Sequence, residues 1–361
     1  MKILDRYLMR KYLSTFLFTC LVFSLIAIII DFSDKVEEFI DEHLSARQVI
    51  FEYYINFIIY INGILWPLFA LIAVIFFTSR LAYNSEIIAS LAAGISFRRL
   101  MVPYALSAAL IAGVHLLANH YFIPYGNKSR VTFEHKYIWK ESDHGKTRDV
   151  HLFIGPETKV YVRYYSKPDS AARNIRIERF QDGSLVELLR ADRAEWQGPP
   201  NRWKLRNYEI RRFRGLHEEI VIGRGQEIDT AFNLTPRDFV WYANEKEMLT
   251  TPELKAHIAR EQQRGVVNTR IYEVELYRRT ADPFTIIILT FIGMPLAARK
   301  VRGGMGLHLA LGVGIGAIFI FLSRFTITFA MNETMPPLLG VWLPNIIFGG
   351  IAAYLVRKAQ K

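Results

Sequence analysis

The chain has 361 residues, of which 51% are hydrophobic and 22% charged, and its formal net charge at pH 7 is +11. The basic residues are spread along the chain instead of forming one patch, which argues against a nucleic-acid-binding protein. The single cysteine, Cys20, lies in an apolar segment, so an intrachain disulfide is excluded.

Six apolar segments approach the roughly 20 residues that a helix needs to cross a bilayer core. The first is longer than the apolar part of a signal peptide and lacks a small-residue cleavage site after it, so it predicts a retained membrane helix. In the second, Pro67 predicts a kink. The fourth is short and is expected to extend back through Tyr277. The predicted spans are residues 12–30, 53–78, 100–123, 283–298, 307–331 and 338–356.

The charge beside these spans predicts their orientation, because basic residues near span ends stay in the cytoplasm. The two short loops opposite the N-terminus contain only Lys35 and Arg47 as basic residues. Both termini are therefore expected in the cytoplasm, and the large segment between the third and fourth spans outside it. The basic residues on the predicted cytoplasmic side are Lys2, Arg6, Arg10, Lys11, Arg80, Arg98, Arg99, Arg299, Lys300, Arg302, Arg357, Lys358 and Lys361.

The large outer segment has a β pattern. Apolar and polar residues alternate over 160–165, 175–178 and 207–211, and turn signals lie at 155–156, 182–183 and 198–200. Short strands at this spacing predict a sandwich or a jelly roll. A short helix is expected from Thr251, as N-cap, to about Arg264. The predicted organisation is residues 1–123 with three spans, 124–270 as an outer β domain with a short helix, and 271–361 with three more spans.

A short helix is predicted on the cytoplasmic side between the second and third spans, over residues 84–94. Asn84 is suited to the N-cap and Gly94 to the position after the helix. The helix could insert into a groove on a cytoplasmic partner or lie in the lipid headgroups, and both interpretations remain open. The apolar residues expected on one face are Ile87, Ile88, Leu91 and Ala92.

Arg324 lies within the fifth predicted span, where a cation is energetically costly. It is interpreted as a contact for an anionic substrate, with a structural ion pair or a side chain reaching for the membrane surface as alternatives. The polar residues His115, Asn119 and His120 are interpreted as interfacial. The spacing of Gly312 and Gly316 predicts close helix packing.

Several catalytic signatures are missing from the sequence. It contains no G-x4-G-K-[ST] nucleotide-binding loop, no H-E-x-x-H metalloprotease motif and no G-x-S-x-G nucleophile motif. The histidines also lack the spacing of metal ligands. The sequence therefore predicts a protein without enzymatic activity, metal or cofactor.

Motifs along the whole chain resemble the permeases of the lipopolysaccharide-export ABC transporter, the LptF/LptG family. The opening residues resemble the LptG-like branch slightly more than the LptF-like branch. The motifs are residues 1–8, 85–96, 253–258, 272–279 with Pro283, 293–296 and 343–344.

This resemblance implies a multi-pass protein of the bacterial inner membrane whose jelly-roll-like domain is periplasmic. It implies a sibling permease subunit, a dimeric cytoplasmic ATPase, periplasmic bridge proteins and lipopolysaccharide as substrate. Residues 84–94 would be the coupling helix, with Glu86 engaging the ATPase. The residues implied in coupling are Ser85, Glu86, Ile87, Leu91 and Gly94.

The first span departs from the family pattern. Some members carry several lysines at its outer end that hold lipid phosphates, whereas this stretch has only Lys35, in a shifted position. Lys35 and Arg324 are the predicted substrate contacts. Two other classes of function are weighed beside transport by an ABC permease: a membrane-anchored sensor or scaffold whose outer domain binds a ligand, and a secondary transporter that works alone.

Overall fold

The computed structural model describes residues 3–139, 147–199, 201–239, 245–265, 269–299 and 304–359. The chain divides into two compact units. The helical unit comprises Met1–Lys140, Lys246–Leu254 and Arg270–Lys361, and the sheet unit comprises Glu141–Glu245 and Lys255–Thr269. The sheet unit thus begins at Glu141, whereas the sequence placed the boundary after residue 123.

Six stretches of helix in the described chain are long and apolar enough to cross a membrane, and each overlaps one of the predicted apolar segments. α4 (Glu86–Ala92) lies between the second and the third. The six stretches are α1 (Ile3–Asp41); α2 (Ala46–Gln48) with η1 (Val49–Tyr54) and α3 (Ile55–Tyr83); α5 (Phe97–Leu117) with η2 (Ala118–Phe122) and α6 (Ile123–Tyr137); α9 (Arg270–Ala297); α10 (Gly304–Met331); and α11 (Pro337–Ala359).

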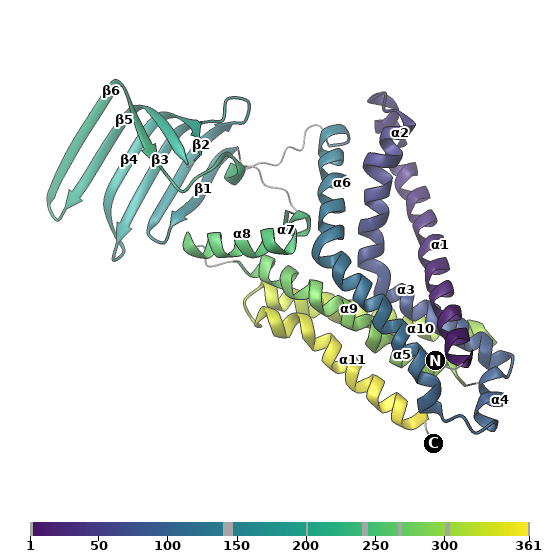
Figure 1. Ribbon diagram of the computed structural model, residues 1–361. Helices are drawn as coiled ribbons and strands as arrows, with labels where there is room; N and C mark the ends of the chain where they lie inside the picture. The colour runs from purple at the N-terminus through teal and green to yellow at the C-terminus, as the bar shows by residue number, and fades with distance from the viewer. Residues whose placement is uncertain are drawn as a thin grey trace. The chain divides into compact units, whose positions relative to one another are not determined.

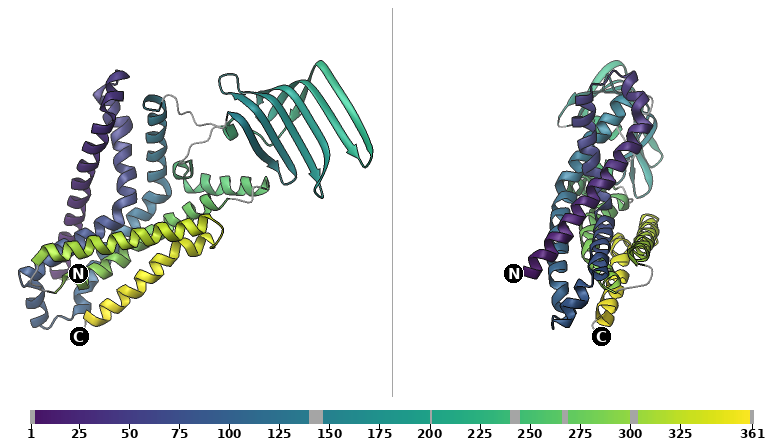
Figure 2. Two further views of the ribbon diagram at one scale, coloured as in Figure 1. Left: turned by 180° about the vertical axis from the view of Figure 1, so that it is seen from behind. Right: turned by 90° about the vertical axis from the view of Figure 1, so that its right-hand side faces the viewer.

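The first three stretches are longer than a membrane requires. α1 has 39 residues, which at a rise of 1.5 Å per residue gives a helix of about 58 Å, against a hydrocarbon core of about 30 Å. Together α1, α3 and α6 extend side by side at one end of the helical unit (Figures 1 and 2). Phe39, Tyr53 and Phe133 join them there in a buried aromatic cluster, which stabilises helix where the sequence is polar.

The core of the helical unit surrounds α3, which packs on α1, α9 and α10 and continues through Pro67. Leu71, Ile75 and Ile292 are almost completely buried there. The predicted close packing of the α10 glycines is confirmed, since a Cβ atom at Gly316 would lie 2.7 Å from Leu68 Cδ1. α10 can therefore approach α3 closely.

The strands predicted around residues 160–165, 175–178 and 207–211 are confirmed in β2, β3 and β5. All neighbouring strands are antiparallel and follow one another in chain order. Such an order is a meander in one sheet, whereas a jelly roll has two sheets, so the described strands do not confirm the jelly roll. The strands are β1 (Arg148–Gly155), β2 (Thr158–Ser166), β3 (Ala171–Gln181), β4 (Ser184–Gly198), β5 (Arg202–Arg214) and β6 (His217–Ala231).

The sheet is curved, with β1 and β6 at its edges (Figure 1). Alternate residues of the inner strands, such as Val162, Ile175 and Leu205, form its buried core. Trp203 closes the core by donating a hydrogen bond of 2.9 Å from Nε1 to the carbonyl of Leu234. Next come η3 (Pro236–Phe239), α7 (Glu245–Met248) and α8 (Thr251–Gln263).

The helix predicted from Thr251 is confirmed as α8, but its predicted cap is wrong. The N–H and the hydroxyl of Thr250 both donate to Glu253 Oε2, each at 2.7 Å, so Thr250 is the residue that caps the start of the helix. Thr251 Oγ1 instead contacts His120 and Arg279 within the helical unit. The hydroxyl that the sequence assigned to a local cap thus makes tertiary contacts.

Candidate functional site

The predicted coupling segment folds as α4, a short helix closed by left-handed residues at both ends. Ser85, with φ of 62°, precedes the helix and caps it without a side-chain hydrogen bond, so the predicted N-cap at Asn84 is wrong. Asn84 Nδ2 instead donates to Glu86 Oε1 at 3.4 Å. Gly94 has φ of 84°, which a residue without a Cβ adopts most easily.

The apolar residues of α4 do not share one face as expected. Ile87 is 6% exposed and packs into the core of the helical unit, whereas Ile88 and Leu91 are 50% and 40% exposed. The helix is therefore held to the spans by Ile87 and presents a second apolar surface outward. That surface is suited to a partner protein or to lipid.

Glu86 stands at the edge of an apolar crevice between α1, α4, α5 and α9. The hydroxyl of Tyr7, on α1, donates to Glu86 Oε2 at 3.0 Å. The crevice is also lined by the apolar residues Leu8, Ile87 and Met294. Close by, Arg99 Nη2 lies 2.6 Å from Oδ2 of the buried Asp5, which ties α1 to α5.

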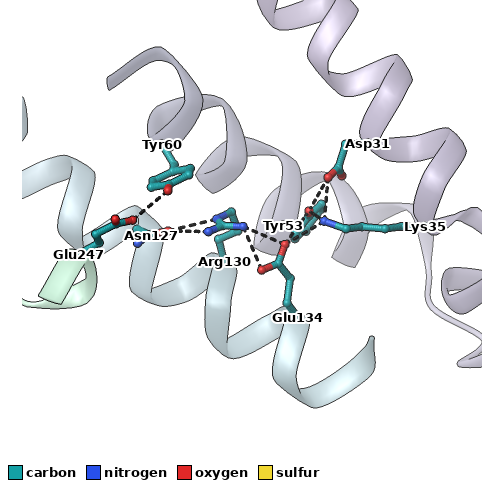
Figure 3. A network of polar contacts seen from close by, with 8 residues as sticks. All are labelled: Asp31, Lys35, Tyr53, Tyr60, Asn127, Arg130, Glu134 and Glu247. Carbon is teal, nitrogen blue, oxygen red and sulfur yellow. Dashed lines mark hydrogen bonds and ion pairs between the residues drawn. The ribbon is translucent and has the colours of Figure 1, made fainter. Parts of the chain in front are cut away.

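Lys35 lies in a cluster of paired charges at the other end of α1 (Figure 3). Its ammonium nitrogen is 2.7 Å from Asp31 Oδ1 and 2.8 Å from Glu134 Oε1, and it also bonds to the hydroxyl of Tyr53. Arg130 Nη1 lies 2.9 Å from each oxygen of Glu134. The two cations and two carboxylates balance, so the charge of Lys35 is already compensated within the chain.

This cluster continues along α6 and α3. The guanidinium of Arg130 donates to Asn127 Oδ1 and lies 4.4 Å from the ring centroid of Tyr60. The Tyr60 hydroxyl donates to Glu247 Oε2, on α7, at 2.9 Å (Figure 3). The i,i+4 spacings of Asp31 with Lys35 and of Arg130 with Glu134 are local signals for a network that joins four distant parts of the chain.

Arg324 lines a cavity of about 230 Å³ within the helical unit. One part of its wall is polar and the remainder apolar, including Leu68, Leu289, Phe319 and Ile320. An amphiphilic cavity of this kind is suited to a molecule with both a charged and an apolar part. The polar lining residues are Tyr60, Asn119, Glu247, Glu275, Arg278, Arg279, Asp282, Thr285, Ser323 and Arg324.

The carboxylates around this cavity come from α7 and α9. Glu275 pairs with Arg278 at 2.9 Å and with Arg279 at 3.1 Å. Asp282 lines the same cavity as Arg324, so acidic groups of another span face the volume that Arg324 faces. Arg324 itself is exposed in the single chain and keeps its charge accessible.

The polar residues of the third span are internal ties and not the interfacial groups predicted. His115 is fully buried, with Nε2 2.8 Å from the carbonyl of Gly63. Asn119 is 8% exposed and donates to the carbonyl of Arg279 at 3.3 Å. The complete burial of His115 could not be inferred from its place near a span end.

Arg279, which is 3% exposed, is a functional candidate that sequence reasoning missed. Besides Glu275, its guanidinium donates to the carbonyl of Lys246 at 3.0 Å and to Thr251 Oγ1 at 3.2 Å. Both acceptors belong to the segment through which the chain returns from the sheet unit. Arg279 thus fixes that segment to α9.

Within the residues that the structure describes, no group of histidine, cysteine, aspartate and glutamate is arranged to hold a metal ion. A family model described as lipopolysaccharide export system permease LptF/LptG matches residues 6–358. Comparison with curated proteins gives no match. The matched range includes α4, Lys35, the cavity with Arg324 and the whole sheet unit.

Proposed function

Since the chain belongs to the LptF/LptG family of lipopolysaccharide export permeases, we propose that it extracts lipopolysaccharide from the inner membrane and passes it to a periplasmic bridge. The family's members are non-catalytic transport subunits. The match over nearly the entire chain is the observation that carries the proposal, and the six candidate spans agree with it.

In the proposed topology both termini and α4 are cytoplasmic, and the sheet unit is periplasmic. An even number of spans places both termini on one side. The asymmetry of basic residues selects the cytoplasm for that side, because Lys35 and Arg47 are the only basic residues of the two short loops opposite.

The proposed partners are a sibling permease and a dimeric cytoplasmic ATPase. In the most apolar stretches of α1 and α10, 11% and 17% of residues are buried, compared with 61% in α9. α1 and α10 therefore offer apolar faces for lipid and for the sibling subunit. α4 offers a different surface, which combines the exposed Ile88 and Leu91 with the acidic Glu86. Such a surface is suited to a groove on the ATPase that is apolar and has a basic rim.

The amphiphilic cavity is the proposed contact for the lipid. Arg324 would hold an anionic group while the apolar wall, including Phe319, faces acyl chains. Lys35 contributes to phosphate binding only when Asp31 or Glu134 has released it. We therefore assign Arg324 the larger share of the contact.

The sheet unit is the proposed exit towards the bridge. Its edge strands β1 and β6 have one unpaired side each among the described strands. Such an edge can pair with a strand of another chain. A continuous sheet would then extend from this chain into the partner or bridge protein that pairs with it.

The test is purification of the native complex in mild detergent, followed by identification of its proteins and of its bound lipid by mass spectrometry. A co-purifying ATPase and bound lipopolysaccharide would support the proposal. The second candidate, a membrane-anchored sensor or scaffold, predicts a ligand on the sheet unit and no ATPase. Purification without an ATPase and without lipopolysaccharide would exclude the transport function.

A further inference from the structure

The contact between α1 and α4 is polar on one side and apolar on the other. Tyr7 OH donates to Glu86 Oε2 at 3.0 Å, and Ile87 fills the adjoining apolar crevice. A hydrogen bond to a carboxylate is stronger than one between neutral groups. Movement of α4 therefore displaces a charged acceptor that is bonded directly to α1.

α1 carries such a displacement over a long distance, because it is one uninterrupted helix from Ile3 to Asp41. Near its start, the ion pair between Asp5 and Arg99 also ties it to α5. Near its end, Lys35 ties it to Glu134 on α6 and to Tyr53 on η1. Between these ends α1 is packed loosely, since 11% of the residues in its most apolar stretch are buried.

We propose that Tyr7 is a positioning residue that transmits the movement of α4 to α1, through its hydrogen bond to Glu86. The proposal rests on the function proposed above, in which α4 receives the ATPase. It adds a route by which ATPase movement reaches α1, which carries Lys35, the second proposed lipid contact. Docking and transmission are then separate tasks: the charge of Glu86 serves the first, and the hydroxyl of Tyr7 the second.

The geometry of Glu86 allows both tasks at once. A carboxylate has two oxygens with about four acceptor positions. Tyr7 uses one position on Oε2, and Asn84 approaches Oε1 at 3.4 Å. The remaining positions can accept a basic side chain of a partner while Tyr7 stays bonded.

Tyr7→Phe is the decisive variant, because it removes the hydroxyl and keeps the ring in place. The complex of this chain with its sibling subunit, ATPase and bridge proteins is reconstituted in vesicles that contain lipopolysaccharide. ATP hydrolysis and lipid removed from the vesicles are measured on the same sample. We expect normal ATPase co-purification, continued ATP hydrolysis, and about ten-fold less lipid removed per ATP, in keeping with the loss of a hydrogen bond to a charged group.

The matched control is Tyr354→Phe on α11. Tyr354 is 61% exposed, and its ring, rather than its hydroxyl, faces Lys358. This variant should keep the normal ratio of lipid to ATP. Tyr7→Ala, which also removes the ring from the crevice, should uncouple at least as strongly as Tyr7→Phe.

The outcomes separate this inference from the proposed function. A normal ratio of lipid to ATP in Tyr7→Phe overturns the role of Tyr7, even if Tyr7→Ala is defective. Loss of ATPase co-purification in Tyr7→Phe also overturns it, because the hydroxyl would then serve docking. If wild-type complex removes no lipopolysaccharide, the proposed function fails first.

Discussion

Arg324 and Lys35 differ in what surrounds their charge. Lys35 is held by two carboxylates and a tyrosine, and its side chain is 17% exposed. Arg324 is exposed at the wall of an amphiphilic cavity, with acidic residues elsewhere on that wall. A phosphate would have to displace existing partners from Lys35, whereas Arg324 can be approached directly.

Arg324→Ala should lower lipid crosslinking and export. Without this cation, the acidic groups of the cavity wall would repel the anionic part of the lipid. Arg324→Lys should retain part of both, since lysine keeps the charge but lacks the planar guanidinium that binds two oxygens. Crosslinking of lipopolysaccharide to a photoreactive residue at Phe319 measures the effect in cells. Normal crosslinking and export in the alanine variant would show that Arg324 has only a structural role.

Glu86→Arg should weaken docking of the ATPase while the helical unit stays folded. Removal of one partner from a charged interface pair costs about 2–5 kcal/mol, and charge reversal should be no milder. Recovery of the ATPase with the purified permease is the measurement. Glu86→Gln, which removes the charge and keeps the shape, should give an intermediate loss. Full recovery with Glu86→Arg would contradict the assigned role.

The limits of sequence reasoning at this scale follow from separation along the chain. The sequence identified Lys35 as the one basic residue of its stretch and could not identify its partner Glu134, which is 99 residues away. The same holds for Thr251, whose hydroxyl the sequence assigned to a local cap and the fold gives to His120 and Arg279. Local patterns identify polar residues that matter and do not identify their partners.

At the scale of elements, hydropathy predicted the six spans because each has a long apolar stretch. It did not predict that α1 and α6 extend well beyond those stretches. Their extensions are polar in sequence and depend on aromatic residues such as Phe39, Tyr53 and Phe133, which come from three helices. The alternation of apolar and polar residues predicted the strands for the same reason, because it is a local pattern. The way in which strands assemble into one or two sheets depends on pairings between distant residues.

The turn after α8 provides a prediction about the sheet unit. Gly265 has φ of 76°, and a Cβ atom there would lie 2.6 Å from Pro156 Cα. Gly183 has φ of 77° with no atom within 4 Å of the same position. Both alanine variants incur the cost of a left-handed residue, about 1–2 kcal/mol, whereas only Gly265→Ala adds a clash with backbone of about 1–3 kcal/mol.

Thermal unfolding of the sheet unit in the detergent-solubilised full chain, followed by limited proteolysis, should therefore rank the variants. We expect wild type to be the most stable, then Gly183→Ala, then Gly265→Ala. Equal stability of the two variants would show that Pro156 moves aside at little cost. The clash would then not fix the turn to the strand end.

For the molecule as a whole, the asymmetric flanking charges and the even number of spans provide the argument for orientation. The family match agrees with a membrane permease. All strands of the sheet unit must lie on one side of the membrane, because the described spans belong to the helical unit.

Ser184 is suited to test this orientation, because it is exposed and directly follows the turn at Asp182 and Gly183. In a chain carrying Cys20→Ala, a cysteine at position 184 should react with a membrane-impermeant maleimide in intact spheroplasts. A cysteine replacing the exposed Ala93, beside α4, should react only after permeabilisation. The opposite pattern would place the sheet unit in the cytoplasm, and the charge asymmetry would then be unrelated to orientation. The proposed function places the ATPase contact on α4 in the cytoplasm and the lipid exit on the sheet unit in the periplasm. That result would therefore contradict both assignments.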